Sequence, residues 1–437
     1  MFNFGLKETI SYDDVTLAPA YSKLMSRSDA DPSQHGFQLP IIGSCMDTLG
    51  YNMMECLIQT NIPFIAHRAF KTVEEQFQHF IPNESFTFPF KRYKNIWWAV
   101  GSVQKYKGWI IYLYNKGVRN FCIDMAHGDS QACVDTIKFI KKFDKTKKAE
   151  SKNTPGSCLT SLGAGDCPVH IIAGNVATKE GFKRLQKAGA NGIRVGIASG
   201  SICSTNLETG MGLPVLTSII ECAKVKKKNV WLIADGGIRS AGDIAKAIYF
   251  GADFCMIGKL LAATDLACGQ CYNKDLQLIK QINLNLNLSD TPMKLIESFL
   301  KFNRPVYPEH FDELLKEAEK LDEELVNLDI KFKIPVKRTK LVFLNLVAYK
   351  AYHGMASRAA RNNILNYAAV EGVEGFLKYA GSTNKFISDT KLRLQSALSY
   401  AGATNWKDFK KSVKAYKRST SAITAADVHM DIITKLH

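Results

Sequence analysis

The sequence has no uninterrupted apolar stretch long enough to cross a membrane, since Lys, Asp or Gly breaks its longest apolar runs. Residues 1–10 hold neither the basic leader nor the apolar core of a signal peptide, so we expect a cytoplasmic protein. The eleven cysteines form no regular framework and no paired Cys-x-x-Cys motifs, which favours reduced thiols over a disulfide scaffold. Most of them, Cys255 included, should pack as small apolar residues.

Signatures of nucleic-acid binding are also missing, although the net charge is +16. We find no zinc finger, RRM motif or Arg-rich arm, and the lysines cluster densely only at 141–148 and 224–228. We interpret the charge as a solvated basic surface that also attracts anionic nucleotides. A nucleic-acid-binding protein is the alternative, and it would show a steep salt dependence of affinity.

Short β-branched runs alternate with helical stretches from about residue 95. A length of 437 residues with 46% hydrophobic residues is ordinary for one barrel that carries insertions. The runs predicted as strands are apolar on both faces, which is typical of a parallel sheet. No GxGxxG follows the first strand, so a Rossmann fold is disfavoured. We predict an α/β fold, a (β/α)8 TIM barrel, with strands at NIWWAVGS, VRNFCID, VHIIAGNV, ANGIRVGI, VWLIADGG and ADFCMIG.

Three regions are predicted. Residues 1–271 should form most of the barrel, 272–340 a helical insertion, and 341–437 a mobile flap with a C-terminal segment that completes the site. The insertion holds an amphipathic helix, PEHFDELLKEAEKLDEELVNL, whose Pro and acidic residues lie in its early turns. We favour a surface insertion without a specific role; a regulatory or oligomer-contact role is the alternative.

Polar residues follow the predicted strands at their C-terminal ends, the catalytic face of such barrels. They are Asp124, Asn175, Cys203 beyond Gly196, Asp235 and Gly258. Residues 195–212 are the most informative segment, because their glycines permit close approach of the backbone to a ligand. Cys203 lies in this loop, where nearby backbone N–H groups can favour a nucleophilic thiolate. Without other motifs, a loop cysteine of no consequence would be the better interpretation.

Two glycine turns predict a phosphate site. Gly236 and Gly237 lie between a strand and a helix in ADGGIRSAGD, as do Gly258 and Lys259 in MIGKL. Glycine amides at late strand-to-helix loops commonly bind phosphate in barrels, and Lys259 would add a point charge.

With these residues in view, the sequence resembles the IMP dehydrogenase and GMP reductase family over about 1–270 and 347–405. The order and spacing of the shared motifs make a chance match implausible. They are SYDDVTLAPAYS, PIIGSCMDTLG, IDMAHGDS, IIAGNVAT, VGIASGSICST, ADGGIRSAGDIAKA, MIGKLLA, YKAYHGMAS and SALSYAGAT.

The resemblance implies a reaction in which Cys203 attacks C2 of a purine 5′-monophosphate and a nicotinamide cofactor exchanges a hydride. It further implies a homotetramer. The implied substrate contacts are Ser201, Asp235, Gly236, Gly237, Gly258, Lys259, Gly354, Met355 and Ala356. The implied cofactor contacts are Asp124, Met125, Ala126, His67, Asn175 and Tyr367. Main-chain carbonyls of Ala198, Gly200 and Cys203 would hold a monovalent cation, K+.

The resemblance favours a GMP reductase, which uses NADPH to convert GMP to IMP and ammonia. No tandem regulatory module follows HRAF, and SRAARNNILNYAAVEG lacks the Arg-Tyr pair of the dehydrogenases. Thr205 and Glu371 occupy the positions that manage the departing ammonia in reductases. The alternatives are an IMP dehydrogenase that oxidises IMP to XMP with NAD, and a catalytically idle nucleotide-binding protein. Three departures from the family pattern put the cation site and the cofactor-phosphate contacts in question: Ala198, Ser199 and Ala368.

Several of these residues have simpler interpretations. Glu371 could be a surface carboxylate, and Asp124 could cap the following helix. His67 and Arg68 could pack at the barrel rim, and His127 is expected to be structural or to contact the cofactor. Tyr349 and Tyr352 could pack beside the base-binding turn.

Overall fold

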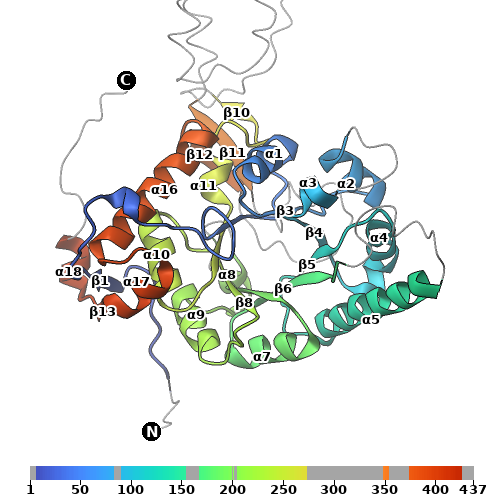
Figure 1. Ribbon diagram of the computed structural model, residues 1–437, viewed down its shortest axis with the longest axis horizontal. Helices are drawn as coiled ribbons and strands as arrows, with labels where there is room; N and C mark the ends of the chain where they lie inside the picture. The colour runs from blue at the N-terminus through green and yellow to red at the C-terminus, as the bar shows by residue number, and fades with distance from the viewer. Residues whose placement is uncertain are drawn as a thin grey trace, which may run out of the picture.

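Eight parallel strands close into one barrel at the centre of the molecule, as the sequence predicts (Figure 1). The structure, a computed structural model, describes residues 6–82, 90–153, 167–198, 200, 204–272, 348–353 and 374–425. The barrel strands are β2 (Ile41–Gly43), β3 (Phe64–Ala66), β4 (Ile96–Val100), β5 (Asn120–Asp124), β6 (His170–Val176), β7 (Gly192–Val195), β8 (Trp231–Asp235) and β9 (Phe254–Ile257). Ile41 of β2 lies opposite Cys255 of β9, and this pairing closes the ring.

Helices surround the barrel because each strand is followed by a segment with a polar face and an apolar face. They are α1 (Tyr51–Gln59), α2 (Val73–Phe80), α3 (Phe90–Tyr93), α4 (Val103–Asn115), α5 (Gln131–Asn153), α7 (Lys179–Ala188), α9 (Val215–Ala223) and α10 (Ala241–Tyr249). Side-chain caps mark several starts: Thr178 accepts from the Gly181 amide at α7, and Ser240 accepts from the Asp243 amide at α10. Helix α7 ends at Gly189, whose φ of 107° suits glycine.

The apolar core has two parts. Inward-facing strand residues fill the barrel, among them Ile42, Ile172 and Ile233, and the predicted packing residue Cys255 is buried between strands and helices. Trp97, His170 and Trp231 pack together at the N-terminal end of the barrel. Because side chains fill this end, the polar chemistry is confined to the C-terminal end.

A small antiparallel sheet lies beyond β9. It consists of β10 (Cys271–Tyr272), β11 (Tyr349–His353) and β12 (Glu374–Lys378), with β11 in the middle. We call it the flap-root sheet, because the predicted flap residues fall between β11 and β12. It packs near the short α11 (Lys259–Ala262) and α1 (Figure 1).

The chain ends on the outer side of the barrel. Here α16 (Thr383–Tyr400), α17 (Trp406–Ser412) and α18 (Thr420–Ala425) accompany an antiparallel pair, β1 (Val15–Ala18) with β13 (Lys414–Lys417). A single-turn 3-10 helix, η1 (Arg27–Asp29), contacts α16. The predicted insertion helix at 308–328 lies outside the described residues. Among the residues that are described, no helix combines the length and apolar character of a membrane span.

Candidate functional site

A buried arginine joins two strand-end carboxylates at the C-terminal end of the barrel. Arg194 of β7 faces the barrel interior and is 6% exposed. Its Nη1 lies 2.6 Å from Oδ1 of Asp124, the last residue of β5. Its Nη2 lies 2.8 Å from Oδ2 of Asp235, the last residue of β8. The strand order thus brings together, through Arg194, two residues that the sequence places 111 positions apart, counting from 124 to 235.

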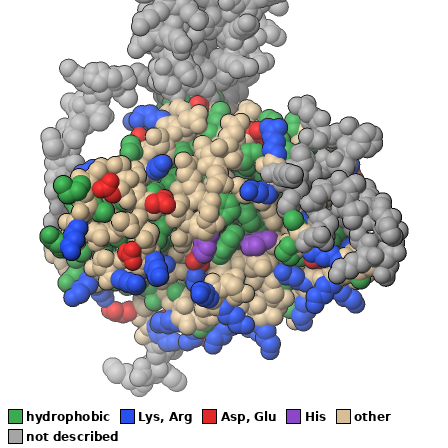
Figure 2. All heavy atoms as spheres, viewed as in Figure 1, with side chains coloured by type: hydrophobic (Ala, Val, Ile, Leu, Met, Phe, Trp, Pro, Cys, Tyr) green, Lys and Arg blue, Asp and Glu red, His purple; other side chains and the backbone are tan. Residues whose placement is uncertain are grey.

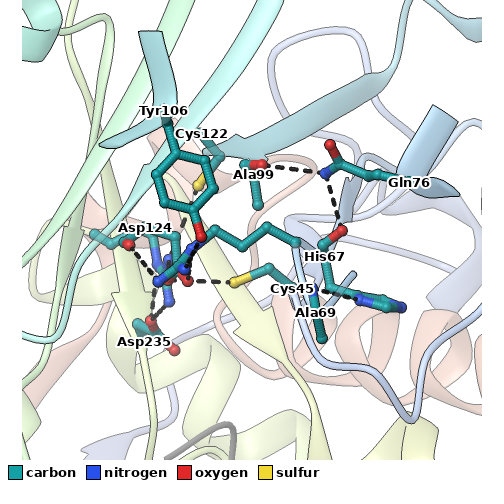
Figure 3. Close-up of polar contacts among 11 residues, drawn as sticks. Cys45, His67, Ala69, Gln76, Ala99, Tyr106, Cys122, Asp124 and Asp235 are labelled. Carbon is teal, nitrogen blue, oxygen red and sulfur yellow. Dashed lines mark hydrogen bonds and ion pairs between the residues drawn. The ribbon is translucent and has the colours of Figure 1, made fainter. Parts of the chain in front are cut away.

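A second arginine contacts the same carboxylate. Nε of Arg68 lies 3.3 Å from Oδ2 of Asp124, and Nη1 donates to the Tyr106 hydroxyl at 2.9 Å. Figure 3 shows Asp124, Asp235 and the Tyr106 ring converging with the Cys45 thiol, which points at Asp124 from 3.6 Å. Asp124 therefore pairs with arginines rather than capping the next helix, and this answers the alternative raised from the sequence.

The charges in this network balance. Burial alone would raise the pKa of Asp124, but Arg194 and Arg68 outweigh it and hold that pKa below its ordinary value. Burial works against the charge of Arg194 as well, yet the carboxylates of Asp235 and Asp124 help to raise its pKa above the ordinary value. The Cys45 thiol has a strongly raised pKa because it is buried. Cys45 is therefore a protonated donor and a poor nucleophile.

Asn175 extends the network along β6. Its Nδ2 donates to Asp235 Oδ2 at 2.7 Å and to the Gly196 carbonyl at 2.8 Å. The side chain therefore orients Asp235 and bonds to the start of the loop that follows β7; the cofactor contact that the resemblance implies for Asn175 stays a prediction.

The loop after β5 is held by backbone bonds to β6. The Met125 amide donates to the Gly174 carbonyl at 3.0 Å, and the Met125 carbonyl accepts from the Asn175 amide at 2.8 Å. A Cβ on Gly128 would lie 2.7 Å from the Gly174 carbonyl carbon, so this close approach requires glycine. The loop leaves Ala126 exposed at the barrel end.

The loop that carries Cys203 has a fixed stem. Ile197 and Leu213 form an antiparallel bridge, so the two ends of the segment that carries Cys203 lie side by side just beyond β7. Ala198 adopts a φ of 59°, the left-handed conformation that glycine favours. The alanine therefore follows a glycine-like main-chain path here. Thr205 begins α8 (Thr205–Thr209) within this loop.

The two predicted phosphate turns lie at the same end of the barrel. Gly236 and Gly237 have φ values of 99° and 74°, which bend the chain between β8 and α10. Gly258 follows β9 directly and is the N-cap of α11, whose first residue, Lys259, is exposed. Both turns thus present glycine backbone at a strand end, as predicted.

An ion pair holds the flap-root sheet to the barrel. Nε2 of His353, the last residue of β11, lies 2.8 Å from Oδ2 of Asp47 in the loop after β2. The neighbouring Tyr352 is buried, and its hydroxyl lies 3.7 Å from Met46 Sδ. The hydrogen bond that His353 donates to Asp47 raises the pKa of His353. The residues that follow β11 in sequence, 354–356, thus start from a fixed point.

His67 is more deeply buried than a side chain at the rim of the barrel would be. It is 4% exposed, stacks on Phe70 and also contacts Phe80. Its Nδ1 accepts from the Ala69 amide at 3.3 Å, which requires a neutral ring nitrogen. Burial lowers the pKa of His67 to about 4, so the ring is neutral near neutral pH.

Several predicted residues lie outside the described part of the chain. These are Ser201, Cys203, Gly354, Met355, Ala356, Tyr367 and Glu371. Their roles, like those of the other predicted contacts, remain predictions.

Sequence reasoning missed Arg194 and the Asp47–His353 pair. A signal for Arg194 was available: an arginine within the apolar strand GIRVGI must find a carboxylate if it is buried. The Asp47–His353 pair had no such signal, because its members are 306 residues apart.

Basic side chains gather along one edge of the face shown in Figure 2. Lys and Arg side chains line much of the lower edge of the molecule, while apolar and histidine side chains lie together near the centre of this face (Figure 2). The described residues contain no group of three or more His, Cys, Asp or Glu that could hold a metal ion.

Known proteins resemble this chain over most of its length. A family profile described as "IMP dehydrogenase / GMP reductase domain" matches residues 9–283 and 337–429. A GMP reductase of Clostridium acetobutylicum is 33% identical over 285 residues, 63% of this chain and 77% of that protein. A GMP reductase of Leishmania major is 43% identical over 171 residues, 39% of this chain. An inosine-5′-monophosphate dehydrogenase of Chlorobaculum tepidum is 43% identical over 155 residues, 35% of this chain.

Coverage of these relatives is uneven, since the aligned region spans only 31% of the Leishmania protein and 27% of the Chlorobaculum protein. The family profile, however, covers well over half of this chain in two blocks. The barrel, the strand-end carboxylates and this profile agree. The chain belongs to the IMP dehydrogenase / GMP reductase family.

Proposed function

We propose that the chain is a purine nucleotide oxidoreductase of the GMP reductase type, converting GMP to IMP and ammonia with NADPH through a covalent bond between Cys203 and C2 of the base. The position of the two ends of the Cys203 loop carries the proposal. The Ile197–Leu213 bridge holds these ends just beyond β7, the strand that carries Arg194, and β7 pairs with β8, which ends at Asp235. Relatives named GMP reductase also outnumber dehydrogenases among the most similar proteins.

The nucleotide would lie across the barrel end. The amides of Gly236, Gly237 and Gly258 would bind the 5′-phosphate, with Lys259 as a nearby positive charge. Asp235 would accept hydrogen bonds from the ribose hydroxyls. Arg194 and Asn175 both bond to Oδ2 of Asp235 and so fix the plane of its carboxylate before substrate arrives. Ser201 and residues 354–356 would complete the base and phosphate contacts.

The thiol of Cys203 would add to C2 of the purine, and Thr205 with Glu371 would deliver the proton that the departing ammonia requires. A carboxylic acid suits this role if partial burial raises its pKa. Thr205 stands at the start of α8, two residues beyond Cys203. Breaking the C2–N bond releases ammonia, and the sulfur is later expelled as IMP leaves.

The described residues fit a nicotinamide. The Met125–Gly128 loop is bonded to β6 and leaves Ala126 exposed, so it offers a fixed and largely backbone surface at the C-terminal end of the barrel. The cofactor supplies the hydride when bound. Asp124 would help to hold it at this end of the barrel, with its carboxylate oriented by Arg68 and Arg194.

A monovalent cation would also fit the stem of the loop. Main-chain carbonyls are neutral hard donors that suit K+. The left-handed φ of Ala198 keeps a main-chain conformation that glycine favours at that position, which supports the proposal of a cation site despite the departure from the family pattern. Gly200 and Cys203 would supply the other carbonyls.

The test is a turnover assay on the purified full chain with every nucleotide and cofactor pairing. We expect reduced-nicotinamide absorbance to fall with GMP and NADPH and IMP to form. Cys203→Ser should abolish turnover, whereas Cys167→Ser, a matched substitution away from the barrel end, should not. Formation of XMP from IMP and NAD would replace this proposal with the dehydrogenase. Nucleotide binding without turnover in either direction would indicate an idle family member.

A further inference from the structure

A Cys-x-x-Cys motif, Cys268-Gly-Gln-Cys271, connects the barrel to the flap-root sheet. The other cysteines are scattered along the chain, so this motif has no second Cys-x-x-Cys motif to pair with. Two thiols at this spacing can close a short disulfide, and the motif is typical of dithiols that cycle between oxidised and reduced states. In the structure neither cysteine is in a disulfide; Cys268 is exposed and Cys271 is buried.

The chain turns between the two cysteines. It bends at Gly269, and the Cys271 thiol points back at the Gly269 carbonyl, 3.9 Å away. A Cβ on Gly269 would collide with the carbonyl oxygen of Ala351, so the turn is pressed directly against β11. A dissolved oxidant should therefore react first with the exposed Cys268. The buried Cys271 would then react with the modified Cys268 rather than with the oxidant itself.

The surroundings of Cys268 suit an attacking thiol. Its sulfur accepts a hydrogen bond from the amide of Gly50, the N-cap residue of α1, and fills the space that a side chain on Gly50 would need. His79 Nε2 lies 3.2 Å from the same space. The thiol and the imidazole thus both border Gly50, the N-cap residue of α1.

Proton transfer from Cys268 needs an acceptor near this point. Although Cys268 is exposed as a residue, its sulfur packs beside Gly50, and this desolvation raises its pKa; Asp47 adds to the rise, while the Gly50 amide and Lys350 oppose it. The thiol is therefore protonated near neutral pH and needs a base. Desolvation lowers the pKa of His79, so its imidazole is neutral there and can accept the proton.

We propose that Cys268 and Cys271 are a redox-active dithiol that low-molecular-weight disulfides oxidise to an intramolecular disulfide. The Cys268 thiol loses its proton to His79 and attacks one sulfur of the oxidant. The oxidant's S–S bond breaks, and one thiolate leaves and is protonated. Cys271 then loses its proton and attacks the Cys268 sulfur, which expels the second thiolate. The two cysteines together lose two electrons and two protons, and the oxidant gains them and becomes two thiols.

Oxidation would alter the root of the flap. The Cys268 amide donates to the Thr48 carbonyl, and the Ala351 amide donates to the Gln270 carbonyl, both at 2.8 Å. Lys350, beside Ala351 on β11, donates to the Ala267 carbonyl at 2.8 Å. To reach Cys271, the Cys268 sulfur must leave the Gly50 amide, and this turn must rearrange against β11. Residues 354–356 follow β11, so nucleotide binding should weaken.

Mass analysis of the full chain tests the proposal without depending on turnover. The reduced protein is incubated with oxidised glutathione, then alkylated with iodoacetamide and digested. We expect the peptide that holds both cysteines to lose two hydrogens and to take up no iodoacetamide. Cys271→Ser should stop at a glutathione adduct on Cys268, Cys268→Ser should form no disulfide at this motif, and Cys167→Ser should behave as the unaltered chain.

Two results would overturn the proposal, and both are read on the unaltered chain. One is full alkylation of both cysteines after incubation with oxidised glutathione. The other is a glutathione adduct on Cys268 that persists without closing to a disulfide. Calorimetric titration with GMP before and after oxidation measures the consequence: affinity should drop severalfold and return with dithiothreitol. If the chain has no turnover at all, the mass result still decides the proposal.

Discussion

The side chain of Ala198 occupies the space that a side chain on Gly212 would need: a Cβ on Gly212 would lie 2.6 Å from the Ala198 Cβ. Both residues belong to the stem of the Cys203 loop, next to the Ile197–Leu213 bridge. Ala198 is in the left-handed region at φ 59°, and Gly212 has a φ of 157°. The two positions are therefore coupled through packing and through backbone strain.

This coupling predicts the outcome of a double-mutant cycle. Gly212→Ala should destabilise the protein because its new Cβ meets that of Ala198, and Ala198→Gly should recover part of the loss. Direct neighbours typically show coupling of about 0.5–3 kcal/mol. Urea unfolding of the two single variants and the double variant measures it. Additive effects would show that the loop stem relaxes and that the contact carries no energy.

Substitution of Arg194 should be far more costly than that of a surface arginine. Arg194→Met removes the cation between Asp124 and Asp235 and leaves two carboxylates buried without it. Breaking a buried ion pair typically costs about 3–5 kcal/mol. Arg184→Met is the matched control, because Arg184 pairs with Asp129 at the surface, where little change is expected. Equal midpoints of urea unfolding for the two variants would contradict the proposed importance of the network.

Stability should fall as pH drops from about 6.5 to about 4, because two histidines are held neutral in the folded protein. Burial lowers the pKa of His67 to about 4, and burial followed by Lys141 lowers that of His170 to about 4. Between these pH values the unfolded chain binds protons that the folded chain does not, so acid favours unfolding. Each histidine would contribute about 3 kcal/mol at the acid end.

The variants His67→Gln and His170→Gln isolate this effect. His67 Nδ1 accepts from the Ala69 amide and His170 Nδ1 accepts from Trp97 Nε1 at 3.1 Å, and glutamine keeps an acceptor but cannot titrate. Unfolding free energies between pH 4 and 7 should show a shallower slope in each single variant and the shallowest in the double variant. An unchanged slope would mean that other groups cause the acid sensitivity.

The His353–Asp47 pair should control nucleotide binding if the proposed function holds. The hydrogen bond to Asp47 raises the pKa of His353, so its stabilising charge pair is complete below the unfolded value of about 6.5 and is lost as pH rises through the folded value. Asp47→Asn should raise KM for GMP severalfold with a smaller change in kcat. In the unaltered chain, KM for GMP should rise as the pH passes the folded pKa of His353. This rise should be absent in Asp47→Asn. A uniform fall in kcat at unchanged KM would contradict a positioning role.

Local sequence patterns predict most of the strands, helices and turns of this fold. The alternation of buried strands such as NFCID and WLIAD with amphipathic helices predicts a barrel, because parallel strands covered on both faces must be apolar throughout. The strand ends at Asp124 and Asp235 and the turns at Gly236 and Gly258 could be found in the same way. Each depends on a residue and its immediate neighbours in the chain.

The partners of those residues depend on closure of the barrel. The Asp124–Arg194, Asp235–Arg194 and Asp47–His353 pairs join residues 70, 41 and 306 positions apart. No periodicity encodes such pairs, because a charged side chain takes whichever partner the assembled strands bring within reach. Local composition thus sets which strands and turns form, while strand order and burial in three dimensions set which charges neutralise one another and where the two ends of the Cys203 loop meet.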